Sequence, residues 1–154
     1  MRIVGLDVGE RRIGVAISDP TATLARPVGV LRSVALDADA LEQAAREVSR
    51  LACEDDGVAT IVVGLPRRLD GTPNDMTLRV ELFARELGVL THLPVFMQDE
   101  RLTSREAESR LAVREKDWRA RKRELDAAAA AIILQDYLDT RPGRPVPVSD
   151  DPEF

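Results

Sequence analysis

With 154 residues, the chain has room for one domain with a substantial core, which its 44% apolar content can fill. Its single cysteine, Cys53, excludes an internal disulfide and a multi-cysteine metal site, as is usual in a reducing cytosol. No apolar stretch reaches the roughly 18 residues of a membrane span, and no secretory leader opens the sequence. We therefore expect a soluble, cytoplasmic protein with no membrane partner.

The first 32 residues predict three β-strands. Residues 2–8 and 12–18 are mostly apolar runs, and the short turn at residues 9–11 joins them as a hairpin. Residues 25–32 form the third strand, and Pro27 indicates an edge position or an irregular start because proline cannot donate a ladder hydrogen bond.

Helices and strands should then alternate. Apolar residues recur at helical spacing over residues 37–56, and Gly57 should end this helix, which would make Cys53 a small core residue. The β-rich run at residues 60–64 has the length of a buried strand.

A second helix should follow the turn residues 69–74, with Gly88 as its stop. One of its faces carries Met76, Val80, Phe83 and Leu87. Residues 94–98 form the fifth strand, and His92, just before it, should be a surface loop residue. The spacing of Thr103 and Glu106 predicts a capping box for a further helix.

The last helix should run from about residue 124 to residue 138, because the proline-rich residues after it cannot continue a helix. Residues 1–140 then form one domain, and residues 141–154 form a proline-rich, acidic tail that we expect to be disordered. Three early strands followed by alternating helix and strand predict a three-layer α/β fold with a mixed five-stranded sheet flanked by helices.

Acidic residues lie at the ends of three apolar segments. Asp7 closes the first strand, Asp99 and Glu100 close the fifth, and Asp126 opens the last helix. A carboxylate held against apolar surroundings is costly unless a charged group neutralises it, and a divalent cation is the usual solution. This pattern indicates a hard-cation site for phosphodiester chemistry. At Asp7, taken alone, a β-turn acid with a local hydrogen bond is the competing interpretation.

Helical spacing places Asp126 on one face with Ala130, Ile133 and Tyr137, which indicates that it points inward toward the sheet. The competing interpretation is an acid in the first turn of a helix, where it interacts favourably with the helix dipole. In the pair Asp99 and Glu100, strand alternation sends the two carboxylates to opposite faces, and periodicity does not choose between them.

The net charge of −5 is unevenly distributed. Residues 101–123 contain nine basic and four acidic residues, a local charge of +5, which leaves −10 on the rest of the chain. This stretch could neutralise phosphates through Arg101, Arg119, Arg121, Lys122 and Arg123, and Trp118 could stack on a base. Arg11 and Arg12, beside Asp7, could also hold phosphate. The alternative is a solvated helix face with charge pairs and a tryptophan that packs on the body.

Four segments of the sequence resemble the conserved blocks of the YqgF family, also called RuvX. These segments are residues 6–9 with 12–16, residues 62–66 with 70–72, residues 99–104, and residues 126–134. Members of this family are RNase H-fold proteins that are named as Holliday-junction resolvases and pre-16S ribosomal RNA nucleases. The likeness spans about residues 2–139. Each block alone is a weak signal of the family, but four blocks in order at the right separations make a specific one.

The resemblance implies an RNase H-like fold and a nuclease that depends on Mg²⁺ or Mn²⁺. It implies catalytic and metal-binding roles for Asp7, for Asp126, and for the acid of the third block, where it favours Glu100 over Asp99. It also implies RNA or branched DNA as the partner, in pre-16S rRNA processing or at Holliday junctions. Residues 121–125 depart from the family pattern, since a basic, helical stretch replaces the expected glycine- and lysine-rich connection.

Two alternatives belong to other classes. Actin-like ATPases and sugar kinases also open with such a hairpin, but they need a second domain, for which 154 residues leave no room. The other alternative is a nucleic-acid-binding ribosome-maturation factor with little or no catalysis. The sequence leaves open whether the substrate is RNA or DNA, whether cleavage is endo- or exonucleolytic, which metal is preferred, and whether the protein is a monomer or a homodimer.

Overall fold

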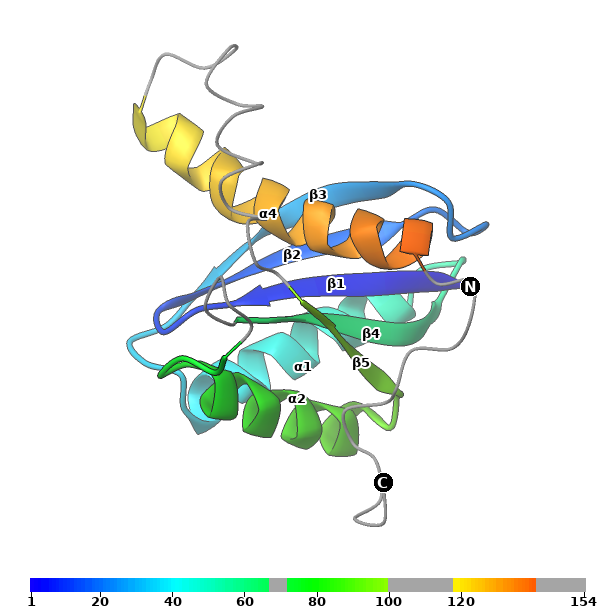
Figure 1. Ribbon diagram of the computed structural model, residues 1–154. Helices are drawn as coiled ribbons and strands as arrows, with labels where there is room; N and C mark the ends of the chain where they lie inside the picture. Colours follow the sequence, from blue (N-terminus) through cyan, green and yellow to red (C-terminus); the bar gives the residue numbers. More distant parts are fainter. Residues whose placement is uncertain (67–71, 100–117, 141–154) are drawn as a thin grey trace.

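The computed structural model describes residues 1–66, 72–99 and 118–140, and for residues 118–126 it describes the backbone only. Strands alternate with helices after an initial three-stranded meander (Figure 1). The elements are β1 (Arg2–Val8), β2 (Arg12–Ser18), β3 (Ala25–Arg32), α1 (Ala38–Ala52), β4 (Val58–Leu65), α2 (Thr77–Thr91), β5 (Val95–Asp99) and α4 (Trp118–Thr140). Of the helices in these ranges, none combines the length and the apolar character that a membrane crossing requires.

The five strands form one mixed sheet in the order β3-β2-β1-β4-β5. Strand β1 lies in the centre, where it pairs antiparallel with β2 and parallel with β4, and β4 pairs parallel with β5. The carboxyl ends of β1, β4 and β5 therefore meet at one edge of the sheet. The predicted mixed five-stranded sheet with flanking helices is confirmed.

Two apolar cores separate the layers. Helices α1 and α2 pack on one face of the sheet over alternate strand residues such as Val4, Leu6 and Ile61. Helix α4 packs on the other face over Ile3 and Val62. Figure 1 shows α4 above the sheet, and α1 and α2 below it. Because side chains alternate along a strand, each strand residue is assigned to one of these two faces.

Strand β3 forms one edge of the sheet, as Pro27 predicted. The β2–β3 register shifts between Val15 and Ala16, and Pro27 lies directly opposite Ala16. An irregular position on an edge strand tolerates proline, which has no N–H group to donate to the ladder.

Helix α1 is shorter than predicted, since it ends at Ala52 rather than near residue 56. Asp37 caps its start by accepting hydrogen bonds from the backbone N–H groups of Asp39 and Ala40, each at 3.1 Å. Cys53 is the C-cap residue and is exposed, so its prediction as a core residue was wrong. Gly57 does not end the helix directly but turns the chain into β4 with a φ of 61°.

Buried Arg2 ties β1 to the end of α1. Its guanidinium donates hydrogen bonds to the carbonyl oxygens of Gly57 (3.2 Å) and Leu51 (3.0 Å) and to the carboxylate of Glu54 (2.9 Å). The Arg2 side chain thus supplies a donor to the buried Gly57 carbonyl and a second donor to the Leu51 carbonyl, which also accepts from the Glu54 N–H at 3.2 Å.

Helix α2 continues through Gly88, which was wrongly predicted to stop it, and ends at Thr91. His92 follows as an exposed C-cap residue with a φ of 58°, in agreement with its predicted surface position. Gly88 lies where α2 presses on β5, because a Cβ there would come within 3.1 Å of a methyl group of Val95. The predicted apolar face is confirmed, with Val80, Phe83 and Leu87 buried and Met76 packed against the core.

Helix α4 begins at Trp118, six residues before its predicted start, and its 23 residues make it the longest of the described helices. Ala130, Ile133 and Tyr137 are buried against the sheet, as their spacing predicted. Gln135 fixes the helix to the start of β3, since its side chain accepts from the Ala25 N–H and donates to the Thr23 carbonyl, both at 2.9 Å. The predicted capping box at residues 103–106 and the tail at residues 141–154 lie outside the described residues.

Candidate active site

Asp7 lies near the carboxyl end of β1, in the central strand of the sheet. Its neighbours Leu6 and Val8 belong to the α1/α2 core, so alternation assigns Asp7 to the α4 face together with Ile3. Its side chain is half-buried. The strand therefore presents one carboxylate at the end of the sheet where the carboxyl ends of the parallel strands β1, β4 and β5 meet.

Gly5 brings α4 unusually close to β1. A Cβ at Gly5 would lie 2.7 Å from Cβ of Leu134 and 3.3 Å from the carbonyl oxygen of Ala130, so only glycine permits this approach. Asp126 is one helical turn before Ala130, and Asp7 is two residues after Gly5. Figure 1 shows that α4 runs antiparallel to β1, so these two steps lead in the same direction along the sheet.

The lengths of these two steps agree. Two strand residues advance the chain by about 6.6 Å, and four helical residues advance it by about 6 Å. The backbones at Asp7 and Asp126 are thus at similar positions along the direction of β1. The side chain of Asp126 is not among those that the structure describes. Asp126 is the ninth residue of α4, not a first-turn residue. The competing interpretation as a helix-dipole acid was therefore wrong, because that effect is confined to the first turn.

The structure assigns the faces of β5, which sequence periodicity could not do. Val95 and Met97 pack in the α1/α2 core, whereas Phe96 lies on the α4 side with its ring centroid 6.1 Å from that of Tyr137. Asp99 is two residues after Met97 and four after Val95, so it lies on the same face of the strand as they do. This is the face opposite Asp7. Glu100 lies outside the described residues.

The metal site expected from the sequence cannot be complete within the described part of the chain. Among the side chains described there, no group of three or more His, Cys, Asp or Glu residues could hold a metal ion. The expected trio consists of Asp7, which is described, and of Glu100 and Asp126, whose side chains are not.

The β1–β2 hairpin carries the two arginines predicted to contact phosphate. Arg11 and Arg12 are both exposed. The N–H of Gly9 donates to the Arg12 carbonyl at 2.8 Å, and a Cβ at Gly9 would come within 3.2 Å of that oxygen. Gly9 is therefore explained by the closure of the hairpin. The side chains of the other predicted phosphate contacts lie outside the description, namely Arg101, Arg119, Arg121, Lys122 and Arg123.

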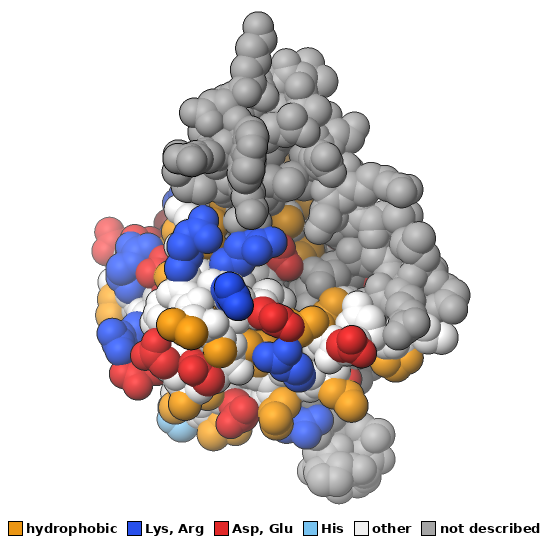
Figure 2. Space-filling model, turned by 90° about the vertical axis from the view of Figure 1, so that its left-hand side faces the viewer, with side chains coloured by type: hydrophobic (Ala, Val, Ile, Leu, Met, Phe, Trp, Pro, Cys, Tyr) orange, Lys and Arg blue, Asp and Glu red, His pale blue; other side chains and the backbone are white. Residues whose placement is uncertain are grey.

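Sequence reasoning missed one basic residue at this end of the sheet. Arg32, the last residue of β3, is exposed and lies directly opposite Arg12 in the β2–β3 ladder. Figure 2, which views this end, shows several arginine side chains side by side. The signal was available, because antiparallel pairing of residues 12–18 with 25–32 brings the first residue of one run opposite the last of the other.

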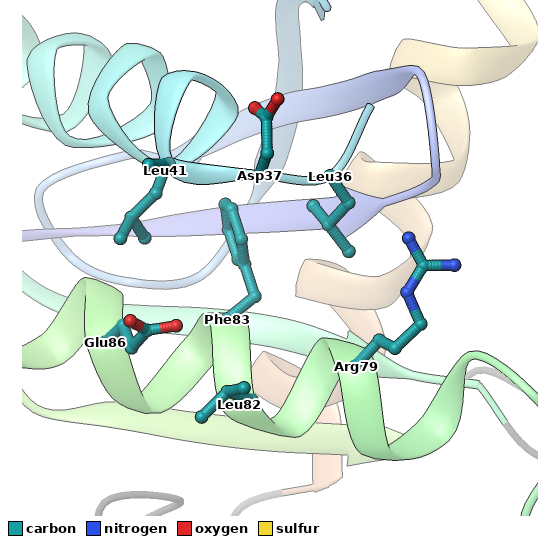
Figure 3. A pocket seen from close by; sticks show the side chains of 8 residues that line it. Leu36, Asp37, Leu41, Arg79, Leu82, Phe83 and Glu86 are labelled. Carbon is teal, nitrogen blue, oxygen red and sulfur yellow. The ribbon is translucent and has the colours of Figure 1, made fainter. Parts of the chain in front are cut away.

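A separate cavity of about 280 Å³ lies between the start of α1 and the outer side of α2. Figure 3 shows Leu36, Leu41 and Phe83 directed toward one another, with Arg79 and Glu86 at the rim. The cavity is on the α1/α2 side of the sheet, away from the face to which Asp7 belongs, so we do not include it in the site.

The profile of one protein family, described as "RuvX: Holliday junction resolvase", matches residues 1–140. The chain belongs to the RuvX family. A relative from Chloroflexus aggregans is 43% identical over 139 residues, which cover 90% of this chain and 94% of the relative. A relative from Anaeromyxobacter sp. (strain Fw109-5) is 43% identical over 145 residues, with coverages of 92% and 98%. Both carry the name "Putative pre-16S rRNA nuclease".

Solved resolvases share the fold of this RuvX chain. A structure of Thermus thermophilus RuvC aligns with a TM-score of 0.55 and 14% identity, and the alignment covers 95% of this chain and all of RuvC. The fowlpox virus Holliday junction resolvase aligns with a TM-score of 0.51 and 14% identity, with coverages of 91% and 99%. The predicted RNase H-like α/β fold is thus confirmed, and the chain is a member of a nuclease family.

Proposed function

We propose that this RuvX protein is a divalent-metal-dependent nuclease in which Asp7, Glu100 and Asp126 bind the metal and hydrolyse phosphodiester bonds. The observation that carries the proposal is the close approach of α4 to β1 at Gly5, because it brings the backbone of Asp126 level with Asp7 on the same face of the sheet. Asp99 belongs to the other face, which favours Glu100 as the third acid.

The chemistry of the donors fits Mg²⁺ or Mn²⁺. Both cations prefer carboxylate oxygen and retain several waters, so two or three carboxylates at the open edge of a sheet suit them. Once bound, such ions supply an activated water and stabilise the leaving oxygen. The half-buried carboxylate of Asp7 would hold the metal where the sheet, α4 and the ends of β4 and β5 limit access by bulk water.

A histidine general base has no place in this mechanism. His92, the chain's only histidine, precedes β5 and therefore lies at the edge opposite Asp7, because β5 and β1 are parallel. In place of a histidine, the carboxylates of Asp7, Glu100 and Asp126 would hold the metal and would accept the proton of the attacking water.

We further propose precursor 16S rRNA as the physiological substrate, with Holliday-junction cleavage as a second activity, in the cytoplasm. The names of the relatives support the RNA substrate, and the description of the family supports the junction substrate. The basic residues Arg119, Arg121, Lys122 and Arg123 at the start of α4, together with Arg101, Arg11 and Arg12, would hold the phosphate backbone.

The decisive experiment uses length-matched, end-labelled RNA hairpins, duplex DNA and four-way DNA junctions with Mg²⁺ or Mn²⁺. The Asp7→Asn variant should lose about 100-fold or more in cleavage rate, the equivalent of several kcal/mol of charge stabilisation. It should still bind substrate. A protein that binds these substrates but cleaves none of them, with either metal, would instead support the ribosome-maturation factor without catalysis.

Neighbouring acids provide a matched control for the site. Glu100→Gln should abolish cleavage, and Asp99→Asn should retain most of it, because alternation assigns Asp99 to the α1/α2 face. Loss of cleavage in Asp99→Asn but not in Glu100→Gln would show that Asp99 is the catalytic acid. It would contradict the assignment of the acids from the alternation of side chains along β5.

The basic start of α4 requires a binding assay. Replacing Arg119, Arg121 and Arg123 with Ala should weaken binding of every sequence tested and make the dependence of log K on log salt shallower by about one unit per lost phosphate contact. An unchanged slope would assign these residues to a solvated helix face, where exposed charge pairs contribute only about 0–1 kcal/mol each.

A further inference from the structure

Two arginines lie opposite each other at the open end of the β2–β3 ladder. Arg12 begins β2, Arg32 ends β3, and the two are direct cross-strand partners with exposed side chains. Like charges directly opposite each other destabilise a sheet. The contact between Arg12 and Arg32 itself therefore opposes folding, which raises the question of what these two positions bind.

The ladder geometry brings the two side chains especially close. The N–H of Ser33 donates to the carbonyl oxygen of Arg11 at 3.0 Å, so these two residues form a hydrogen-bonded pair. Hydrogen-bonded and non-hydrogen-bonded pairs alternate along an antiparallel ladder. Arg12 and Arg32 are therefore a non-hydrogen-bonded pair, the kind in which the Cα atoms are only about 4.5 Å apart and the side chains lie closest.

Both arginines belong to the face that carries Asp7. Ile13 and Leu31 pack in the α1/α2 core, so their neighbours Arg12 and Arg32 alternate to the α4 side. Asp7 is the cross-strand partner of Gly14, which places Arg12 diagonally next to it on β2. With strands about 4.8 Å apart, Arg32 on β3 lies about 10 Å from β1.

Nearby acids do not neutralise Arg32. Glu10, at the hairpin tip, pairs instead with Arg79 of α2 at 3.2 Å, on the other side of the sheet. Within the described part of the chain, Arg32 makes no ion pair. Its guanidinium therefore remains available to a ligand that carries several negative charges.

We propose that Arg32, together with Arg12, binds backbone phosphates of the substrate strand within a few nucleotides of the bond that is cut. The strand then leaves the site across β2 and β3 toward the β3 edge. This inference rests on the proposed nuclease function, because it uses Asp7 as the position of the scissile phosphate. The chemistry recognised is the phosphodiester backbone itself, which arginine binds through its forked donors.

The test measures binding without cleavage, so that it is separate from catalysis. In an Asp7→Asn background, fluorescence anisotropy would follow a fluorescein-labelled RNA hairpin and a labelled four-way DNA junction between 50 and 200 mM salt. Arg32→Ala should weaken binding by about fivefold at the lower salt, as expected for a partly exposed ion pair. The salt slope should become shallower by about 0.7 to 0.9, the value for one phosphate contact.

Arg26→Ala is the matched control. Arg26 is also an exposed arginine of β3, but it lies at the far end of the strand opposite Ile17 and should leave affinity and slope unchanged. Equal effects of the two variants, or no effect of either, would overturn the inference while leaving the proposed function intact. Absence of binding to both probes would overturn the inference and the proposed function together.

The charge reversal Arg32→Glu gives a second, independent measurement. It converts the repulsive cross-strand pair with Arg12 into an attractive one, so the melting temperature should rise by up to about 4 °C. Binding should weaken more than in Arg32→Ala. Loss of both stability and binding would show that Arg32 serves the fold rather than the substrate.

Discussion

Replacing Gly5 with alanine should separate α4 from the sheet. The new Cβ would lie 2.7 Å from Cβ of Leu134 and 3.3 Å from the Ala130 carbonyl oxygen, both of which are parts of the helix that cannot rotate away. Overpacking of this kind costs about 1–3 kcal/mol, and the entropy gained by replacing glycine in a strand returns about 0.5–1 kcal/mol. We expect a net loss of about 1–2 kcal/mol.

Thermal unfolding followed by circular dichroism measures this loss. For a chain of this length, 1–2 kcal/mol corresponds to a decrease in melting temperature of about 2–8 °C. Gly29→Ala is the control, because a Cβ at Gly29 meets no atom within 4 Å, and its stability should be unchanged or higher by about 0.5–1 kcal/mol.

The same substitution should reduce activity at temperatures where the variant is fully folded. Helix α4 carries Asp126 one turn before Ala130, so a helix that is lifted at Gly5 changes the separation of Asp126 from Asp7. Misplacement by about 1 Å can cost about 100-fold in rate. Equal melting temperatures for the Gly5 and Gly29 variants, or full activity of Gly5→Ala, would refute the close approach as the feature that positions the acids.

Three further predictions concern charge. Mn²⁺ should raise the melting temperature of the wild type by linkage and should raise that of Asp7→Asn much less, so equal shifts in differential scanning fluorimetry would contradict the metal site. Hydrogen bonds from Thr21, Leu24 and Thr23 hold the pKa of Asp19 well below its usual value, so this carboxylate stabilises the fold above about pH 4 and loses that contribution as the pH falls further. The stability difference between wild type and Asp19→Ala in urea titrations should accordingly shrink below pH 4 and be constant from pH 5 to 7. Arg2→Leu removes the guanidinium donor of the buried Gly57 carbonyl and one of the two donors of the Leu51 carbonyl, so it should cost about 1–3 kcal/mol in urea unfolding, more than the loss of the ion pair alone in a Glu54→Gln control.

The five strands could be predicted because their signals are local. Each strand is an apolar run bounded by turn residues, and the edge position of β3 followed from Pro27. Boundaries that depend on tertiary contacts were predicted less well. Glycine often ends a helix, but Gly88 lies inside α2, where the proximity of Val95 leaves little room for a side chain. A single sequence does not reveal this proximity.

The start of α4 was missed for a related reason. Residues 118–125 lack the apolar spacing that marks a buried helix face, although most of them are strong helix formers. Of the candidate acids, Asp7 was assigned correctly to a strand end, while the choice between Asp99 and Glu100 needed the position of α4. Only the packing of that helix shows which face of β5 corresponds to the face of Asp7.

The order in which the elements occur along the chain has a consequence for synthesis. Strand β1 is translated first among them, but α4, the only described helix on its side of the sheet, follows about 120 residues later. At translation rates of about 5–20 residues per second, this interval lasts roughly 6–24 s. During that time the apolar face under α4 is open, and Asp7 has no partner from the last helix. A nascent RuvX chain on the ribosome, surrounded by ribosomal RNA, would therefore acquire its proposed cutting activity only when its last helix docks.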